Sequence, residues 1–145
     1  MKSYSGFASE KTLTNYIVKM LNQDSNGDVL AYKRTGSGFS NETGKPDITG
    51  CCCGIRLEFE IKDPVRMNQD QEALIIDIEE LWKGTGILGM DTLFKLNQEA
   101  FSELNSIASK IQQVWIRKFK KAGAYTGVVC SPTQVALACL EIRGG

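Results

Sequence analysis

The stretch from Gly44 to Lys62 constrains the fold more than any other part of this chain. Its second half alternates apolar and charged residues, and side chains on a β-strand alternate faces with a period of two. The pattern predicts a strand with one face toward a core and a charged face opposite. The apolar set is Leu57, Phe59 and Ile61, and the charged set is Glu58, Glu60 and Lys62.

Asp47 lies on a short segment (46–49) just before this strand. A hairpin through Cys51–Gly54 would fold that segment back and bring Asp47 alongside Glu60. Carboxylates on two adjacent strands, with Lys62 two residues after the second, can bind a hard divalent cation and position a water beside it. For an E-x-K sequence alone, a solvent-facing strand with mixed charge is the simpler interpretation.

The two elements together, Gly44-Lys-Pro-Asp47-Ile and Glu60-Ile-Lys62, resemble the signature of PD-(D/E)xK nucleases. In the form G-x-P-D-[IL] with E-[VI]-K they resemble the VRR-Nuc family of that superfamily. The resemblance covers roughly residues 5–62 and 109–140. It implies an α/β fold with the PD-(D/E)xK nuclease core, a small mixed β-sheet flanked by helices, in a single domain over residues 1–145.

The composition excludes several kinds of site. The chain has no histidine, so catalysis would rest on carboxylates, lysine or a metal. Its five cysteines include no C-x-x-C spacing, and a zinc site is not expected. We expect a cytoplasmic protein with reduced cysteines, because the sequence shows no signal peptide and no apolar run near the ~20 residues that span a bilayer.

An amphipathic helix is expected to begin after Ser9, a plausible N-cap, because apolar residues recur from there at helical spacing. They are Leu13, Tyr16, Ile17, Met20 and Leu21. Glu10 lies near the N-terminal end of this stripe. The helix dipole alone would favour a glutamate in the first turn, whereas the VRR-Nuc resemblance implies that Glu10 faces the metal site.

Charge is distributed unevenly, although the formal net charge is zero. Residues 1–62 carry eight Lys/Arg and seven Asp/Glu, residues 63–109 carry three and nine, and residues 110–145 carry six and one. A zero net charge argues against non-specific coating of nucleic acid. The middle third is a different kind of segment from its flanks.

The acidic middle interrupts the family resemblance, and we expect a helical insert at about residues 63–108. One apolar helical pattern begins at Asn68 and a second runs from Leu93 to Ile107. A G-x-G-x-x-G run at 84–89 separates them. It follows a helix and not a strand, which favours an interhelical loop over a nucleotide site.

The resemblance resumes at Ser109-x-x-Gln112-x-x-Trp115, followed by a helix that ends at Gly123. Its apolar stripe is expected to comprise Ile111, Val114, Trp115, Phe119 and Ala122. Gln112 borders the stripe and can reach the active site. A rival alignment places the family glutamine at Gln71, but the tryptophan and the terminal glycine agree with Gln112. A strand over 124–130 and a last helix to about residue 140 complete the chain.

Taken as a whole, the resemblance implies a metal-dependent, structure-selective DNA endonuclease that hydrolyses phosphodiester bonds in branched or junction DNA. Mg²⁺ or Mn²⁺ would be bound by Asp47, Glu60, the carbonyl of Ile61, and Glu10 directly or through water. Lys62 would orient the attacking water, and Gln112 would hold Lys62 or that water in place. The alternative is a module with the same fold that binds nucleic acid or protein without cleaving.

The basic residues are the candidate contacts to DNA phosphates. They are Lys33, Arg34, Lys110, Arg117, Lys120 and Lys121. The same residues would be plain solvated charges in a protein that does not bind DNA. The resemblance also implies a homodimer. Its interface could use the apolar stripe of the insert, which includes Leu74, Ile75, Ile78 and Trp82.

Overall fold

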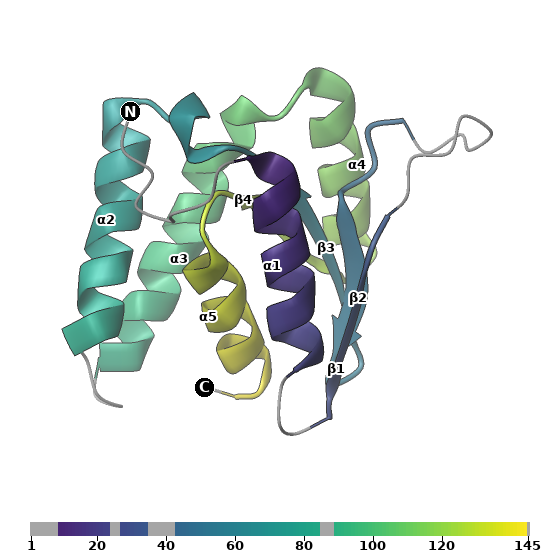
Figure 1. Cartoon of the computed structure of the whole chain (residues 1–145), viewed down its shortest axis with the longest axis horizontal. Coiled ribbons are helices and arrows are strands. Elements are labelled where there is room, and N and C mark those ends of the chain that lie inside the picture. Colours follow the sequence, from purple (N-terminus) through teal and green to yellow (C-terminus); the bar gives the residue numbers. More distant parts are fainter. Residues whose placement is uncertain (1–8, 24–26, 35–42, 85–88, 145) are drawn as a thin grey trace.

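The computed structural model describes residues 9–23, 27–34, 43–84 and 89–144. A four-stranded mixed sheet lies between helices (Figure 1). The α/β class expected from the sequence is therefore confirmed. The elements are α1 (Glu10–Asn22), β1 (Val29–Lys33), β2 (Ile48–Cys52), β3 (Ile55–Ile61), the 3-10 turn η1 (Pro64–Arg66), α2 (Gln69–Gly84), α3 (Met90–Leu104), the 3-10 turn η3 (Asn105–Ile107), α4 (Lys110–Lys121), β4 (Tyr125–Val129) and α5 (Pro132–Ile142).

The strands follow the order β1-β2-β3-β4. The β1–β2 and β2–β3 pairs are antiparallel, and β4 runs parallel to β3. The expected hairpin joins β2 to β3 through Cys53 and Gly54, at φ 50° and 82°. Positive φ at both central residues is typical of a two-residue type I′ turn. Ile48 pairs with Phe59, so the residue before Ile48 lies opposite the residue after Phe59.

The two faces of β3 are covered by different helices (Figure 1). Phe59 and its apolar neighbours pack against α1 and α5 in one buried cluster. On the other face α4 packs over β3 and β4, and Ile116 is its buried residue. The stripe expected on α4 is therefore wrong: Ile111 is 50% exposed and Val114 36%. The sheet face beneath α4 carries buried glutamates, and the helix meets it with Gln112 and Ile116.

The segment expected as an insert is helical, and its second helix belongs to the core. Phe101 on α3 stacks on Phe59, with ring centroids 6.1 Å apart. The approach of α3 to β4 requires Gly127, because a Cβ there would lie 2.4 Å from Phe101 Cδ1. On α2, Ile75 and Ile78 are fully buried within the chain. Much of the apolar stripe that suggested a dimer interface is thus already covered by this chain itself.

The outer edge of β1 is occupied by a side chain. Asn22 donates to the carbonyl of Ala31 at 2.8 Å and accepts from its amide at 2.9 Å. Another strand could pair here only by displacing this side chain. The middle of the G-x-G-x-x-G run lies outside the described residues.

The five cysteines, which all lie within the described ranges, form no disulfide bond. Within the described ranges, no helix combines the length and the apolar character needed to cross a bilayer.

Candidate functional site

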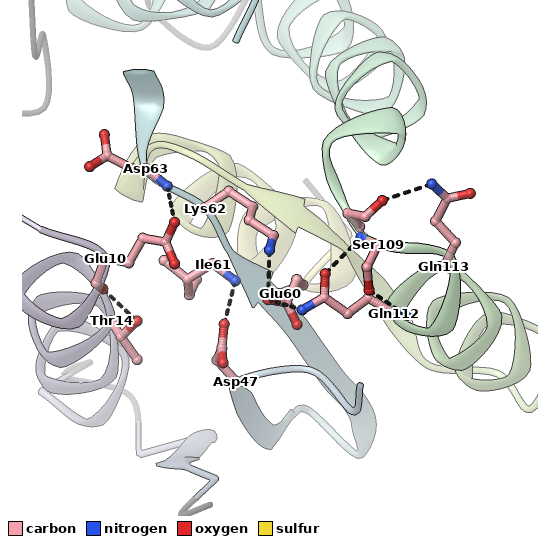
Figure 2. A network of polar contacts seen from close by, with 11 residues as sticks. Glu10, Thr14, Asp47, Glu60, Ile61, Lys62, Asp63, Ser109, Gln112 and Gln113 are labelled. Atoms are coloured by element: carbon pink, nitrogen blue, oxygen red, sulfur yellow. Dashed lines mark hydrogen bonds and ion pairs between the residues drawn. The ribbon is translucent and has the colours of Figure 1, made fainter. Parts of the chain in front are cut away.

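The β2–β3 hairpin brings Asp47 and Glu60 together at one end of the sheet (Figure 2). Asp47 Oδ2 accepts a hydrogen bond of 2.9 Å from the amide of Ile61. This bond fixes the Asp47 carboxylate across the end of β3, beside the Glu60 side chain. The juxtaposition expected from the alternating pattern is present.

The residues before Asp47 are held by contacts that account for the Gly-x-Pro-Asp pattern. Gly44 adopts φ +86°, and a Cβ there would lie 2.9 Å from the side chain of Ile111 on α4. Arg34 Nη1 donates to the carbonyl of Pro46 at 2.6 Å, and the amide of Arg34 donates to the carbonyl of Asp47 at 2.6 Å. The backbone from Gly44 to Asp47 is therefore held in place by contacts with α4 and with Arg34, and these contacts position Asp47 in the site.

Glu60 is 2% exposed, and its two oxygens have different surroundings. Oε2 lies 3.2 Å from Gln112 Nε2 and 3.8 Å from Lys62 Nζ. Oε1 is buried and has no hydrogen-bond partner among the described residues. Burial, together with the negative charge of Asp47 beside it, raises the pKa of Glu60 to about 9, and the positive charge of Lys62 opposes this. A proton or a cation beside Asp47 would stabilise this arrangement.

Gln112 contacts Glu60 because the capping box at the N-terminus of α4 orients the Gln112 side chain. The Ser109 amide donates to Gln112 Oε1 at 2.8 Å in a capping box at the N-terminus of α4. With the amide oxygen used in this way, Nε2 points at Glu60. The rival Gln71 instead caps α2 through Asn68 and donates to the carbonyl of Glu103. Of the two glutamines, the structure brings Gln112 to the paired carboxyls.

Glu10 lies on the first turn of α1, after the Ser9 cap. Its Oε2 accepts a 3.0 Å hydrogen bond from the amide of Asp63, which follows Lys62 directly (Figure 2). The negative charge of Glu10 also contributes to the raised pKa of Glu60. Glu10 therefore belongs to the same electrostatic environment as the paired carboxyls and connects α1 to the end of β3.

The donor set fits a hard divalent cation, although it is incomplete as it stands. Within the described residues, no three acidic or cysteine side chains are arranged to hold an ion together. Asp47 and Glu60 nevertheless supply adjacent oxygen donors, and the buried Glu60 Oε1 lacks a partner. Oxygen ligands of this kind suit Mg²⁺ or Mn²⁺, with remaining positions filled by backbone carbonyls and water.

The predicted phosphate contacts do not form one surface. Arg34 is engaged with Glu58 and with the carbonyl of Pro46, so its role in the structure is to fix the sheet. Lys33 is exposed and donates to Asn15 at 3.3 Å. Lys110 and Lys121 are exposed on α4. Arg117 and Lys120, on the same helix, line a separate groove against α3.

A second group of cations borders the site and was not predicted. Lys45 Nζ lies 4.9 Å from the ring centroid of Trp115, and Lys118 Nζ lies 4.8 Å from it. The guanidinium of Arg56 lies 4.9 Å from the ring centroid of Phe119. The residue spacing on α4 indicated the aromatic pair, but nothing in the sequence indicated that Lys45 and Arg56 would meet it.

No protein-family model, curated protein sequence or solved structure matches this chain.

Proposed function

We propose that this chain is a Mg²⁺- or Mn²⁺-dependent DNA endonuclease with a PD-(D/E)xK core of the VRR-Nuc type. The observation that supports it best is the pair of adjacent carboxyls on the partly buried Asp47 and the buried Glu60, with a lysine ammonium 3.8 Å from Glu60. Acidic groups are rarely placed side by side in a poorly solvated site without a function for the resulting field. Hydrolysis of a phosphodiester uses such a field to bind a cation and to position a water.

Asp47 and Glu60 would hold the cation, with the carbonyl of Ile61 as a further ligand and Glu10 bound directly or through water. When bound, the metal would lower the pKa of a ligated water and offset the charge that develops on the phosphate. Glu60 must release its proton before it can act as a ligand. Cation affinity is therefore expected to rise with pH below the raised pKa of about 9.

Lys62 and Gln112 have separate roles in this proposal. Lys62 is only 8% exposed, so its ammonium acts in a region of low dielectric, where it would orient the attacking water and stabilise negative charge. Gln112 is a positioning residue, because its amide fixes the Glu60 oxygen that faces Lys62. The capping box holds Gln112 in this orientation before substrate binds.

Branched or junction DNA is the proposed substrate class, and a homodimer would present two such sites to two strands. Among the basic residues predicted from sequence, Lys33, Lys110 and Lys121 are exposed and available for phosphates. Arg34 is withdrawn from that set because it pairs with a buried glutamate.

Cleavage of labelled four-way junction, flap, duplex and single-stranded DNA, with Mg²⁺, Mn²⁺ or EDTA, tests this function. We expect metal-dependent nicking of branched DNA that Asp47→Asn and Glu60→Gln abolish. Glu80→Gln is the matched control, because Glu80 is an exposed acid on α2. Tight junction binding without cleavage in any divalent metal would support the alternative of a non-catalytic binding module.

A further inference from the structure

Residues of α3, α4 and β4 line a groove that is separate from the paired carboxyls. Its cavity measures about 350 Å³, within the range of small-molecule sites. Asp47, Glu60, Lys62 and Gln112 are not among its lining residues. The groove is therefore a distinct feature of the chain, and the proposed nuclease chemistry does not use it.

The charged side chains that line this groove are both positive. Arg117 and Lys120 contribute them from α4, and no carboxylate lines the cavity within the described residues. Neither cation forms an ion pair with another described residue. Two cations without a counter-charge beside a concave surface favour the binding of an anion.

The floor contributes a buried polar atom. Thr126 Oγ1 is buried and has no hydrogen-bond partner among the described residues. Thr126 lies beside Glu58 in the β3–β4 register and so faces α4. A buried hydroxyl without a partner is uncommon, and a ligand group could supply the missing bond.

Aromatic rings form part of the wall opposite the cations. Phe101 of α3 and Tyr125 of β4 meet edge to face, with centroids 5.7 Å apart. Both line the groove, together with amide side chains that include Gln113. The cavity thus combines a cationic side, an aromatic side and hydrogen-bonding groups, which together match an anion carrying an aromatic polar body.

We propose that the α3–α4–β4 groove binds a small organic phosphate of the nucleotide class, with the phosphate at Arg117 and Lys120 and the flat body against Phe101 and Tyr125. The volume accommodates one such molecule. The geometry assigns α4 two functions: its N-terminus contacts Glu60, and its last two turns bind this ligand.

Titration of AMP into the isotope-labelled full chain in EDTA tests the site, because EDTA removes cation-dependent binding at Glu60. We expect AMP to shift the amide resonances of Thr126, Gly127 and Gln113, and adenosine, which lacks phosphate, to bind at least about tenfold more weakly. Failure of AMP to bind, or shifts confined to the residues around Glu60, would overturn the proposal.

Arg117→Ala combined with Lys120→Ala should weaken AMP binding by at least about tenfold. Lys118→Ala is the matched control, because it removes one charge from the same two turns but lies over Trp115 outside the groove. Equal weakening by a single Lys118→Ala would indicate a general charge effect and contradict the site.

Thr126→Val keeps the shape of the side chain and removes the hydroxyl. It should weaken AMP binding while leaving the melting temperature of the free protein unchanged or higher, because a buried group without a partner is lost. Unaltered AMP affinity in this variant would exclude Thr126 from the site. Melting curves of every variant establish that binding losses do not arise from unfolding.

Discussion

Glu58 and Glu60 lie two residues apart on the same strand and the same face, yet they occupy opposite kinds of environment. Glu58 is fully buried and accepts hydrogen bonds from Arg34 at 2.9 Å, Arg56 at 2.8 Å and the hydroxyl of Thr49. Glu60 is almost as inaccessible, but it lies beside another carboxyl, and one of its oxygens has no hydrogen-bond partner within the described ranges. Burial alone therefore does not distinguish a structural glutamate from a candidate metal ligand.

The difference lies in the partners, and they come from elsewhere in the chain. A buried charge is tolerated when opposite charges and hydrogen bonds surround it, as at Glu58. At Glu60 the second carboxyl raises the energy of the ionised form, and one lysine at 3.8 Å does not balance it. With Asp47, Glu60 and Glu10 ionised and Lys62 as the positive group acting on Glu60, the site lacks two positive charges, which is what a divalent cation would supply.

The largest expected effect is on cleavage. Asp47→Ala or Glu60→Ala should reduce nicking of junction DNA by at least about 100-fold, because each removes a ligand of the proposed metal. Quantitative cleavage under single-turnover conditions measures this. Wild-type rates in either variant would end the nuclease assignment.

Substitution of the two glutamates should change the free energy of unfolding in opposite directions. Glu58→Ala leaves the mostly buried Arg34 side chain without its counter-charge and should cost about 3 kcal/mol of unfolding free energy. Glu60→Gln removes a repelled charge and should leave the protein equally stable or more stable in EDTA. Urea denaturation of both variants measures the contrast. Similar losses at the two positions would mean that Glu60 is also a structural ion-pair residue.

Much of the candidate site could be predicted from the sequence. The different partners of Glu58 and Glu60 could not. Alternation placed Glu58, Glu60 and Lys62 on one face, and the glycine turn predicted that Asp47 would return beside Glu60. Arg56 is a local partner of Glu58 on the same strand, but Arg34 and Thr49 lie 24 and 9 positions away outside β3, and no local pattern links them to Glu58. The buried face of α4 was also predicted wrongly. The sheet beneath α4 carries buried glutamates, and the helix faces it with Gln112 and Ile116, whereas Ile111 and Val114 are exposed.

The pH dependence of stability should sharpen the same contrast. The folded pKa of Glu60 is raised from 4.5 to about 9, so its contribution to stability is fully present below pH 4.5 and is lost as pH rises toward 9. In EDTA the unfolding free energy should fall across that window, and Glu60→Gln should flatten the decline. Urea titrations at pH 5, 7 and 8.5 measure it. Identical slopes in the two proteins would contradict a raised pKa.

A smaller contrast concerns the two capping glutamines. Gln112→Ala should reduce cleavage by about 10–100-fold, the range found for residues that orient metal ligands. Gln71→Ala should instead cost about 1–2 kcal/mol of stability through its lost bonds to Asn68 and Glu103, without affecting the chemical step. Single-turnover rates and urea melts of both variants separate the roles. Loss of catalysis in a folded Gln71→Ala protein would reverse the assignment.

The smallest effect concerns Lys33 and Arg34, the adjacent cations at the end of β1, and the salt dependence of DNA binding. Each phosphate contact contributes about 0.9 to the slope of log affinity against log salt. Lys33→Ala should therefore lower the slope for junction binding by about one, measured in a non-cleaving Asp47→Asn background. Arg34→Ala should leave the slope unchanged and lower the free energy of unfolding, since the Arg34 guanidinium forms an ion pair with Glu58. If Arg34→Ala flattens the slope while the protein stays fully stable, the pairing with Glu58 does not hold Arg34 when DNA is bound. The difference between the ion-paired Glu58 and the proposed metal ligand Glu60 would then depend on the substrate.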